Sequence, residues 1–426
     1  MTRTTNPSFS NRRSQIAGLS VAELAQEFGT PTFVYDAARI AQRVADLKAF
    51  DTVRYAQKAC STLAILDVIR RNGAVVDAVS AGEIRRALAV GYQPEGAPPP
   101  IVYTADIFDR EALELCVERQ IHVNCGSPDM IDQFGTRALG REITLRINPG
   151  FGHGHSQKTN TGGDQSKHGI WHEELADCLR RADRYGLKVT GLHMHIGSGT
   201  DLEHLAQVCG AMEQTALSVG PSVTNISTGG GLPIPYQADQ SYVDLEAYYA
   251  LWNATRKRLQ EKFHHAIHLE IEPGRYLVAE SGYLIAEVRA VKHQADNLFY
   301  LLDAGFNNLA RPILYGSYHP MAVTLAEEGR SVVERDVIVG GPLCESGDIF
   351  TQEEGGFVAK RCLPEARVGD FVVIECAGAY GFVMGSNYNS KPLAAEVLIE
   401  DGQAHLIRRR QSFDDLVRNE SIPNRQ

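Results

Sequence analysis

The chain has 426 residues, more than one ordinary hydrophobic core accommodates, so its length favours two domains. Apolar residues make up 43% and charged residues 22%, which are values typical of globular proteins. The net charge of −10 gives no footprint for nucleic acid, and no apolar run approaches the roughly 20 residues of a membrane helix. The polar N-terminus predicts no secretory signal, and the eight cysteines lack a C-x-x-C pair, which favours reduced thiols in a cytoplasmic protein.

In chain order, residues 1–15 are predicted to be a flexible tail, and "PTFVYD" (31–36) is typical of a strand. From residue 37 to residue 282, short apolar runs alternate with helical stretches, several of which close with glycine. The runs are 53–59, 75–80, 101–106, 122–126, 142–150, 189–197, 225–231 and 268–274. Eight strands with crossovers predict a (β/α)8 barrel, whereas a doubly wound sheet, the alternative, typically has fewer strands.

After residue 282 the alternation of strand-like and helical stretches stops. Runs such as "YLIAEVRAVKH", "NLFYLLDAG" and "DFVVIECAG" follow one another with turn signals and few helical stretches, which predicts a mainly antiparallel β domain. We expect this domain to comprise residues 283–426 and residues 16–36, so that both chain ends contribute to it.

Candidate functional groups collect at the ends of the eight predicted barrel strands, where barrel enzymes carry their active sites. These residues are Lys58, Asp77, Ser80, Thr104, Asp106, Asn124, Arg146, Asn148, His195, Ser198, Gly229–Gly231, Glu272 and Arg275. Lys58 stands at the edge of a buried strand, where it either reaches into solvent or forms a Schiff base from a dry pocket.

Two adjacent strand ends are rich in glycine. "STGGGLP" (227–233) and "HMHIGSG" (193–199) are typical of the phosphate cup found late in many barrels, although a tight turn would also explain the glycines. The pair His193 and His195 also raises zinc binding and a metal-dependent hydrolase as an alternative, but no other strand end supplies a histidine. We therefore expect His195 to present a flat ring and no metal to be bound.

Glu272, in "EPGR" (272–275), either pairs with Arg275 or faces the ring nitrogen of a pyridine cofactor. An opposite charge would keep that nitrogen protonated and make the ring an electron sink. A Schiff-base lysine, a phosphate cup, a flat histidine and this carboxylate together predict pyridoxal 5′-phosphate (PLP) as the cofactor.

At this point the sequence resembles the alanine-racemase-fold family of PLP-dependent decarboxylases, over roughly residues 15–415. The motifs that carry the resemblance are "TPTFVYD", "VRYAQKACS", "DAVSAGEI", "NPGFGHGHSQKTNTGGDQSKHGIW", "GLHMHIGSG", "STGGGLPIPY", "EIEPGR", "DAGFNNLARPILYGSYH", "GPLCESGD" and "GAYGFVMGSNYNS". The resemblance implies a homodimer with shared active sites and a small-molecule substrate, meso-2,6-diaminopimelate, which would yield L-lysine and CO2.

The resemblance also implies roles for single residues. Lys58 would hold PLP as the internal aldimine, His195 would stack on the ring, and Glu272 would face its nitrogen. The remaining residues expected to bind the cofactor are Asp77, Ser198, Gly230, Gly231, Pro273, Gly274, Arg275 and Tyr380. The partner subunit would supply Cys344 as the proton donor and Glu345 as the partner of the distal ammonium; a thiol of pKa near 8.5 suits this role.

Arg275, Arg311, Tyr315 and Tyr380 would bind substrate, with Glu345. The guanidinium of Arg311 suits the second carboxylate of a diamino diacid, which ornithine and arginine lack at the far end. Decarboxylation of ornithine, arginine or a carboxynorspermidine-type substrate remains the alternative on the same fold. A racemase would need a second base that the sequence does not identify, and a non-catalytic regulator would be expected to lack Lys58 or Cys344.

Overall fold

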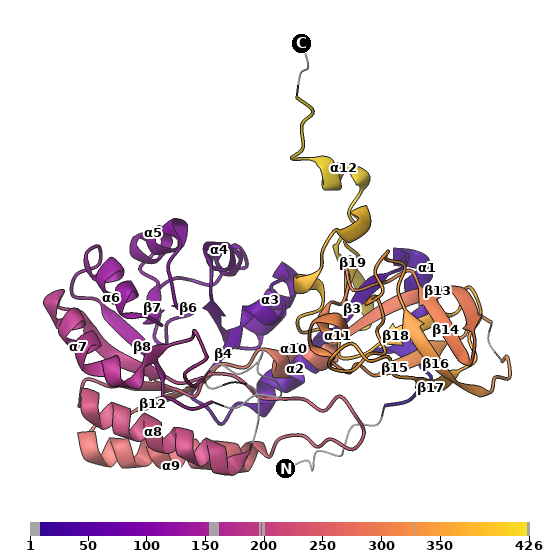
Figure 1. Ribbon diagram of the computed structural model, residues 1–426. Helices are drawn as coiled ribbons and strands as arrows, with labels where there is room; N and C mark the ends of the chain where they lie inside the picture. Colours follow the sequence, from indigo (N-terminus) through magenta and orange to yellow (C-terminus); the bar gives the residue numbers. More distant parts are fainter. Residues whose placement is uncertain (1–8, 153–161, 196, 198–200, 328, 424–426) are drawn as a thin grey trace. The chain divides into compact units, whose positions relative to one another are not determined.

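The computed structural model describes residues 9–152, 162–195, 197, 201–327 and 329–423 (Figure 1). The chain divides into two compact units. One comprises residues 40–234 and 242–277, and the other comprises residues 1–39, 235–241 and 278–426. The short segment 235–241 therefore leaves the first unit and belongs to the second, which the sequence did not predict.

The first unit is the predicted parallel barrel. Its strands follow the order β4-β5-β6-β7-β8-β10-β11-β12, and β12 pairs with β4 to close the ring. The bounds are β4 (Thr52–Ala56), β5 (Val75–Ala78), β6 (Ile101–Ala105), β7 (His122–Cys125), β8 (Glu142–Asn148), β10 (Lys188–His193), β11 (Asn225–Ser227) and β12 (His268–Ile271). A short ninth strand, β9 (Ile170–Trp171), pairs with β8. Both faces of these strands are largely buried, as expected for a parallel sheet covered by helices.

Helices follow the barrel strands and pack against them (Figure 1). They are α3 (Leu63–Arg71), α4 (Ala81–Ala89), α5 (Arg110–Glu118), α6 (Pro128–Gly135), α7 (Leu175–Arg184), α8 (Leu202–Val219) and α9 (Leu245–Phe263). Several begin at a side chain that accepts a hydrogen bond from the first turn; Ser80, Asp109 and Asp244 accept from the residue three positions on. In the part of the chain that the structure describes, no helix combines the length and apolar character needed to cross a membrane.

The second unit is the mainly antiparallel β domain. Its strands are β3 (Thr32–Asp36), β13 (Gly282–Gln294), β14 (Asn297–Leu302), β15 (Met321–Thr324), β16 (Glu334–Gly340), β17 (Arg361–Pro364), β18 (Phe371–Ile374), β19 (Ala395–Glu400) and β20 (Gln403–Arg408). The sheet order is β17-β16-β14-β13-β3-β19-β20, and β18 pairs with both β13 and β15. Because β3 lies between β13 and β19, the N-terminal segment is a central strand of this sheet, and both chain ends build the domain.

Seven further short elements complete the α-helices and strands described in the two units. They are β1 (Gln15–Ile16), β2 (Leu19–Ser20), α1 (Val21–Phe28), α2 (Ala37–Asp46), α10 (Arg275–Val278), α11 (Arg311–Tyr315) and α12 (Phe413–Val417). Helix α1 contributes Val21, Leu24 and Ala25 to the hydrophobic core of the β domain, beside Val34 and Val373. The predicted fold, a barrel with a second β domain, is confirmed.

The structure corrects the strand predicted for 53–59. Strand β4 ends at Ala56, and the 3-10 turn η1 (Gln57–Ala59) follows it. The Tyr55 hydroxyl donates to the carbonyl of Cys60 at 2.9 Å, and the Ala56 N–H donates to the carbonyl of Pro273 at 3.1 Å. These bonds curl the chain at the strand end, so Lys58 lies on a turn rather than in the strand.

Candidate active site

Lys58 lies just beyond the carboxyl end of β4, and its side chain is exposed. The turn that carries it packs against the "EPGR" turn after β12. A Cβ added at Gly274 would lie 3.3 Å from the carbonyl oxygen of Ala56 and from Cβ of Ala59. Two predicted parts of the site, the lysine and "EPGR", are therefore neighbours on one rim of the barrel.

Asp77 lies near the carboxyl end of β5, and its side chain is buried. Burial and the nearby Glu272 carboxylate raise the pKa of Asp77 to about 6, although Thr104 and the charge of Lys58 oppose that shift. Its Oδ1 has no hydrogen-bond partner among the described residues. A buried oxygen without a partner marks a place where a bound group can donate a hydrogen bond.

Glu272 follows the end of β12 and is held at both carboxylate oxygens. The Ser227 hydroxyl donates to Oε1 at 2.7 Å, and Nε2 of His193 lies 3.0 Å from Oε2. Burial alone would raise the pKa of Glu272, but His193, Ser227 and Arg54 outweigh it and lower the pKa to about 2. Glu272 is therefore ionised, and His193 and Ser227 contact its two carboxylate oxygens.

His195 follows the end of β10 and lies two residues beyond His193. Burial disfavours its imidazolium form, and the charges of Arg146 and Lys58 add to this, so its pKa lies well below the usual value. The N–H of Gly230 donates to Nδ1 at 3.2 Å, which leaves the proton of the neutral ring on Nε2. A neutral, oriented imidazole suits stacking on an aromatic cofactor.

The glycines 229–231 form a turn that side chains would block. A Cβ at Gly230 would lie 2.4 Å from the carbonyl oxygen of Glu272, and one at Gly231 would lie 2.2 Å from the carbonyl oxygen of Gly197. Gly231 also has φ of +99°, which favours glycine. The Gly230 N–H donates to His195, and the sequence, which predicted a phosphate cup at this turn, did not indicate that bond. Ser198 lies outside the described residues.

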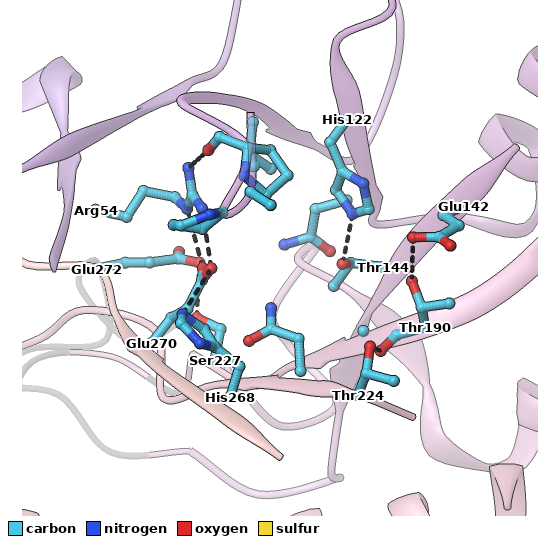
Figure 2. A pocket seen from close by; sticks show the side chains of 17 residues that line it. Arg54, His122, Glu142, Thr144, Thr190, Thr224, Ser227, His268, Glu270 and Glu272 are labelled. Carbon is cyan, nitrogen blue, oxygen red and sulfur yellow. Dashed lines mark hydrogen bonds and ion pairs between the residues drawn. The ribbon is translucent and has the colours of Figure 1, made fainter. Parts of the chain in front are cut away.

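The barrel unit holds a cavity of about 400 Å³, and many of its lining residues lie near the amino ends of the strands (Figure 2). Its walls include the first residues of four strands, namely His122, Glu142, Asn225 and His268. Glu272 and Ser227 also line it, close to Glu270 (Figure 2). Glu272 is among the residues that line the cavity, but most of the predicted site residues do not line it.

Arg54 and Glu270 form a buried ion pair in the wall of this cavity (Figure 2). Nε and Nη2 of Arg54 each lie 3.0 Å from a different oxygen of Glu270. The positive charge of Arg54 also helps to hold the pKa of Glu272 low. Sequence reasoning missed Arg54, Ser227 and the role of His193. The only signal for them was position, because each lies on a barrel strand.

The β domain carries the other predicted site residues. Arg311 begins α11 and is 5% exposed, while Tyr315 ends that helix and is half-buried. Cys344 and Glu345 are both exposed, on a loop where the Cys344 N–H donates to Oδ1 of Asn389 at 2.8 Å. Asp348 fixes this loop by accepting from the N–H of Leu343 at 2.8 Å.

Tyr380 is half-buried in the β domain and has φ of +56°. In the barrel unit the structure thus brings together Lys58, Asp77, His195 and Glu272 with the turns 229–231 and 273–275. In the β domain it describes Arg311, Tyr315, Cys344, Glu345 and Tyr380. Within the described ranges, no group of three His, Cys, Asp or Glu side chains is arranged to hold a metal ion.

The barrel with this rim is matched by a known family model. Residues 37–279 match the model "Pyridoxal-dependent decarboxylase, pyridoxal binding domain". The polar groups at this rim fit such a cofactor, since an ionised carboxylate, a neutral imidazole and a lysine are groups that can hold PLP and tune its ring. The protein is thus a PLP-dependent carboxy-lyase, and the predicted cofactor is confirmed.

Relatives narrow the class further. The diaminopimelate decarboxylase of Escherichia coli (strain K12) is 54% identical over 401 residues, which cover 93% of this chain and 95% of that protein. The diaminopimelate decarboxylase of Streptomyces coelicolor is 52% identical, covering 95% of this chain and 92% of that protein. The chain therefore belongs to the diaminopimelate decarboxylase family.

Solved structures agree. A crystal structure of diaminopimelate decarboxylase has a TM-score of 0.91 and 54% identity, and the match covers 94% of this chain and 96% of that chain. The diaminopimelate decarboxylase of Helicobacter pylori complexed with L-lysine has a TM-score of 0.84 and 31% identity, covering 93% and 98%.

Proposed function

We propose that this chain decarboxylates meso-2,6-diaminopimelate to L-lysine and CO2, the step that completes lysine formation, and does so as a homodimer with shared active sites. The observation that carries the proposal is the buried, ionised Glu272 on the same barrel rim as Lys58, within a chain 54% identical to a diaminopimelate decarboxylase. The two arms of the proposal concern the groups that hold PLP and the groups that select the substrate.

In the barrel, Lys58 would hold PLP covalently through Nζ. PLP, when bound, delocalises the electron pair left on carbon after CO2 departs. Glu272 would supply the negative charge that keeps the ring nitrogen protonated, because a carboxylate with a pKa of about 2 stays ionised at neutral pH. His195 would pack on the ring as a neutral imidazole, in the orientation that the bond from the Gly230 N–H fixes.

The remaining cofactor contacts are proposed for the turns at the rim and for the β domain. Gly231, Ser198 and the segment Pro273–Arg275 would bind the phosphate, together with Tyr380. Gly230 contributes through His195, as well as through the close backbone approach that only glycine permits. Asp77, with its unpartnered Oδ1, would accept a hydrogen bond from the bound cofactor or from Lys58.

Cys344 and Glu345 are proposed to act in the site of the partner subunit. Both side chains are exposed on a loop that Asp348 and Asn389 fix, which suits residues that function outside their own subunit. Cys344 would donate the thiol proton to the carbon that has lost CO2. Glu345 would pair with the distal ammonium of the substrate.

Arg311, with Tyr315, Arg275 and Tyr380, is proposed to bind the substrate. The buried guanidinium of Arg311 is suited to the distal carboxylate, which ornithine and arginine do not carry. Preference for diaminopimelate over ornithine and arginine therefore rests on this residue.

The cofactor arm is tested by borohydride reduction of the PLP-loaded enzyme, which fixes the lysine–PLP linkage, followed by peptide mass mapping. We expect the label on Lys58. The variant Lys58→Ala should lose the label. The control variant Lys48→Arg, at an exposed lysine just after the end of α2, should keep it. Label on another lysine in the wild-type enzyme would overturn the assignment.

The shared-site arm is tested by mixing two inactive variants, Lys58→Ala and Cys344→Ala. If each site combines Lys58 of one subunit with Cys344 of the other, half of the randomly reassociated dimers contain one of each variant, and each of these has one intact site out of two. The mixture should therefore show roughly a quarter of the wild-type activity. Activity that stays at the level of the separate variants would show that both residues serve the same subunit's site.

A further inference from the structure

A buried histidine in the β domain contacts the guanidinium proposed to read the substrate. Nη1 of Arg311 lies 2.9 Å from Nε2 of His319, and it also donates to the hydroxyl of Tyr236 at 3.1 Å. The guanidinium lies 5.1 Å from the centre of the Tyr236 ring. All three residues belong to one unit, because Tyr236 lies in segment 235–241.

The hydrogen bonds fix the tautomer of His319. On its other side, Nδ1 lies 3.0 Å from the backbone carbonyl oxygen of Glu375. A carbonyl can only accept, so Nδ1 must carry a proton; an arginine can only donate, so Nε2 must be unprotonated. The ring is therefore neutral, with a single tautomer that satisfies both neighbours.

The histidine is well placed to orient Arg311 because it is itself rigid. His319 is fully buried, and it is anchored to the backbone beyond β18 by the Glu375 carbonyl. A long arginine side chain loses considerable conformational entropy when it binds a ligand, and prior anchoring of one nitrogen removes part of that cost. The Tyr236 hydroxyl and ring hold the same guanidinium from a second direction.

We propose that His319, in its neutral Nδ1–H form, is a positioning residue that pre-orients Arg311 for the distal carboxylate of the substrate. The inference rests on the proposed function, specifically on Arg311 as the group that binds that carboxylate. His319 does not touch the reacting atoms, so its loss affects ligands that carry the distal carboxylate and spares those that lack it.

The test compares two ligands of the PLP-loaded enzyme by calorimetry. L-lysine retains the distal carboxylate, and 1,5-diaminopentane has the same two amines without it. In His319→Ala we expect the Kd of L-lysine and the KM of meso-diaminopimelate to rise about tenfold. The Kd of 1,5-diaminopentane and kcat should stay within about twofold of wild type.

Two further variants separate positioning from folding. His319→Gln keeps one donor and one acceptor, so it should recover most of the lysine affinity, to within about threefold. His405→Ala removes an exposed histidine from β20 of the same unit and should change neither ligand. Equal weakening of both ligands in His319→Ala, or unchanged lysine binding, would overturn the proposal.

Arg311→Gln distinguishes this inference from the proposed function. If Arg311→Gln leaves lysine binding unchanged, the assignment of Arg311 to the carboxylate is wrong and the role of His319 falls with it. If Arg311→Gln weakens lysine binding and His319→Ala does not, Arg311 keeps its role and only the positioning by His319 is refuted.

Discussion

Replacement of Arg54 by methionine should strongly destabilise the barrel. Arg54 and Glu270 are 1% and 5% exposed, and they share two hydrogen bonds of 3.0 Å. Nη1 of Arg54 also donates to the backbone carbonyl of Pro99 at 2.8 Å. Removing one partner of such a pair leaves the other charge buried, which costs about 3–5 kcal/mol. We therefore expect Arg54→Met to lower the free energy of unfolding by about 4 kcal/mol.

The double variant separates the lost charge from the lost packing. Replacing Arg54 by methionine and Glu270 by leucine removes both charges, so most of the loss should be recovered, to within about 1 kcal/mol of wild type. Arg85→Met breaks an exposed pair with Glu111 and should cost less than about 1 kcal/mol. Urea titrations followed by circular dichroism, at one PLP concentration for all variants, measure these differences. A single variant that loses under 1 kcal/mol, or a double variant as unstable as the single, would refute the reasoning.

Three further predictions concern the rim. Glu272→Gln should make the free energy of unfolding less dependent on pH below the ordinary pKa of glutamate. The pKa of Glu272 is lowered to about 2, so its ionised form stabilises the fold, and that stabilisation is lost as the pH falls from the ordinary glutamate pKa toward 2. Urea midpoints between pH 3 and 6 test this, and an unchanged slope would contradict it. The pKa of Asp77 is raised to about 6, so ionisation of Asp77 lowers the free energy of unfolding of the wild-type protein as the pH rises from about 4 to 6. Asp77→Asn should remove that loss; a pH dependence of the urea midpoint like that of wild type over this interval would count against the assignment. Gly230→Ala should weaken PLP binding about tenfold or more, because a Cβ there would lie 2.4 Å from a backbone carbonyl oxygen, whereas Gly210→Ala in α8, with open space, should not; fluorescence titration with PLP measures both.

The barrel could be predicted because its signal is local and repeated. Each buried run is short and apolar, and each is followed by an amphipathic helix with a recognisable cap, as at Ser80 and Asp109. The sequence placed Lys58 correctly at the end of a barrel strand, but it predicted the strand to continue to residue 59, whereas β4 ends at Ala56. The bond from the Ala56 N–H to Pro273 joins segments more than 200 residues apart, and no local pattern encodes it.

The partners of the predicted site residues were harder to predict. The sequence indicated that Glu272 is a functional carboxylate, but its contacts with His193 and Ser227 depend on which strands become neighbours when the barrel closes. Likewise, the sequence predicted a glycine-rich phosphate cup at residues 227–233, but it did not indicate that the Gly230 N–H donates to Nδ1 of His195. His319 lies inside a quoted motif, yet only the fold shows that it contacts Arg311.

The most direct test of the account is a product assay. Purified enzyme with PLP is incubated separately with meso-diaminopimelate, ornithine and arginine, while released CO2 is measured and the amine product is identified by mass. We expect CO2 and lysine from diaminopimelate and no CO2 from the other two. Release of CO2 from ornithine or arginine, with none from diaminopimelate, would contradict the proposed substrate and the role of Arg311.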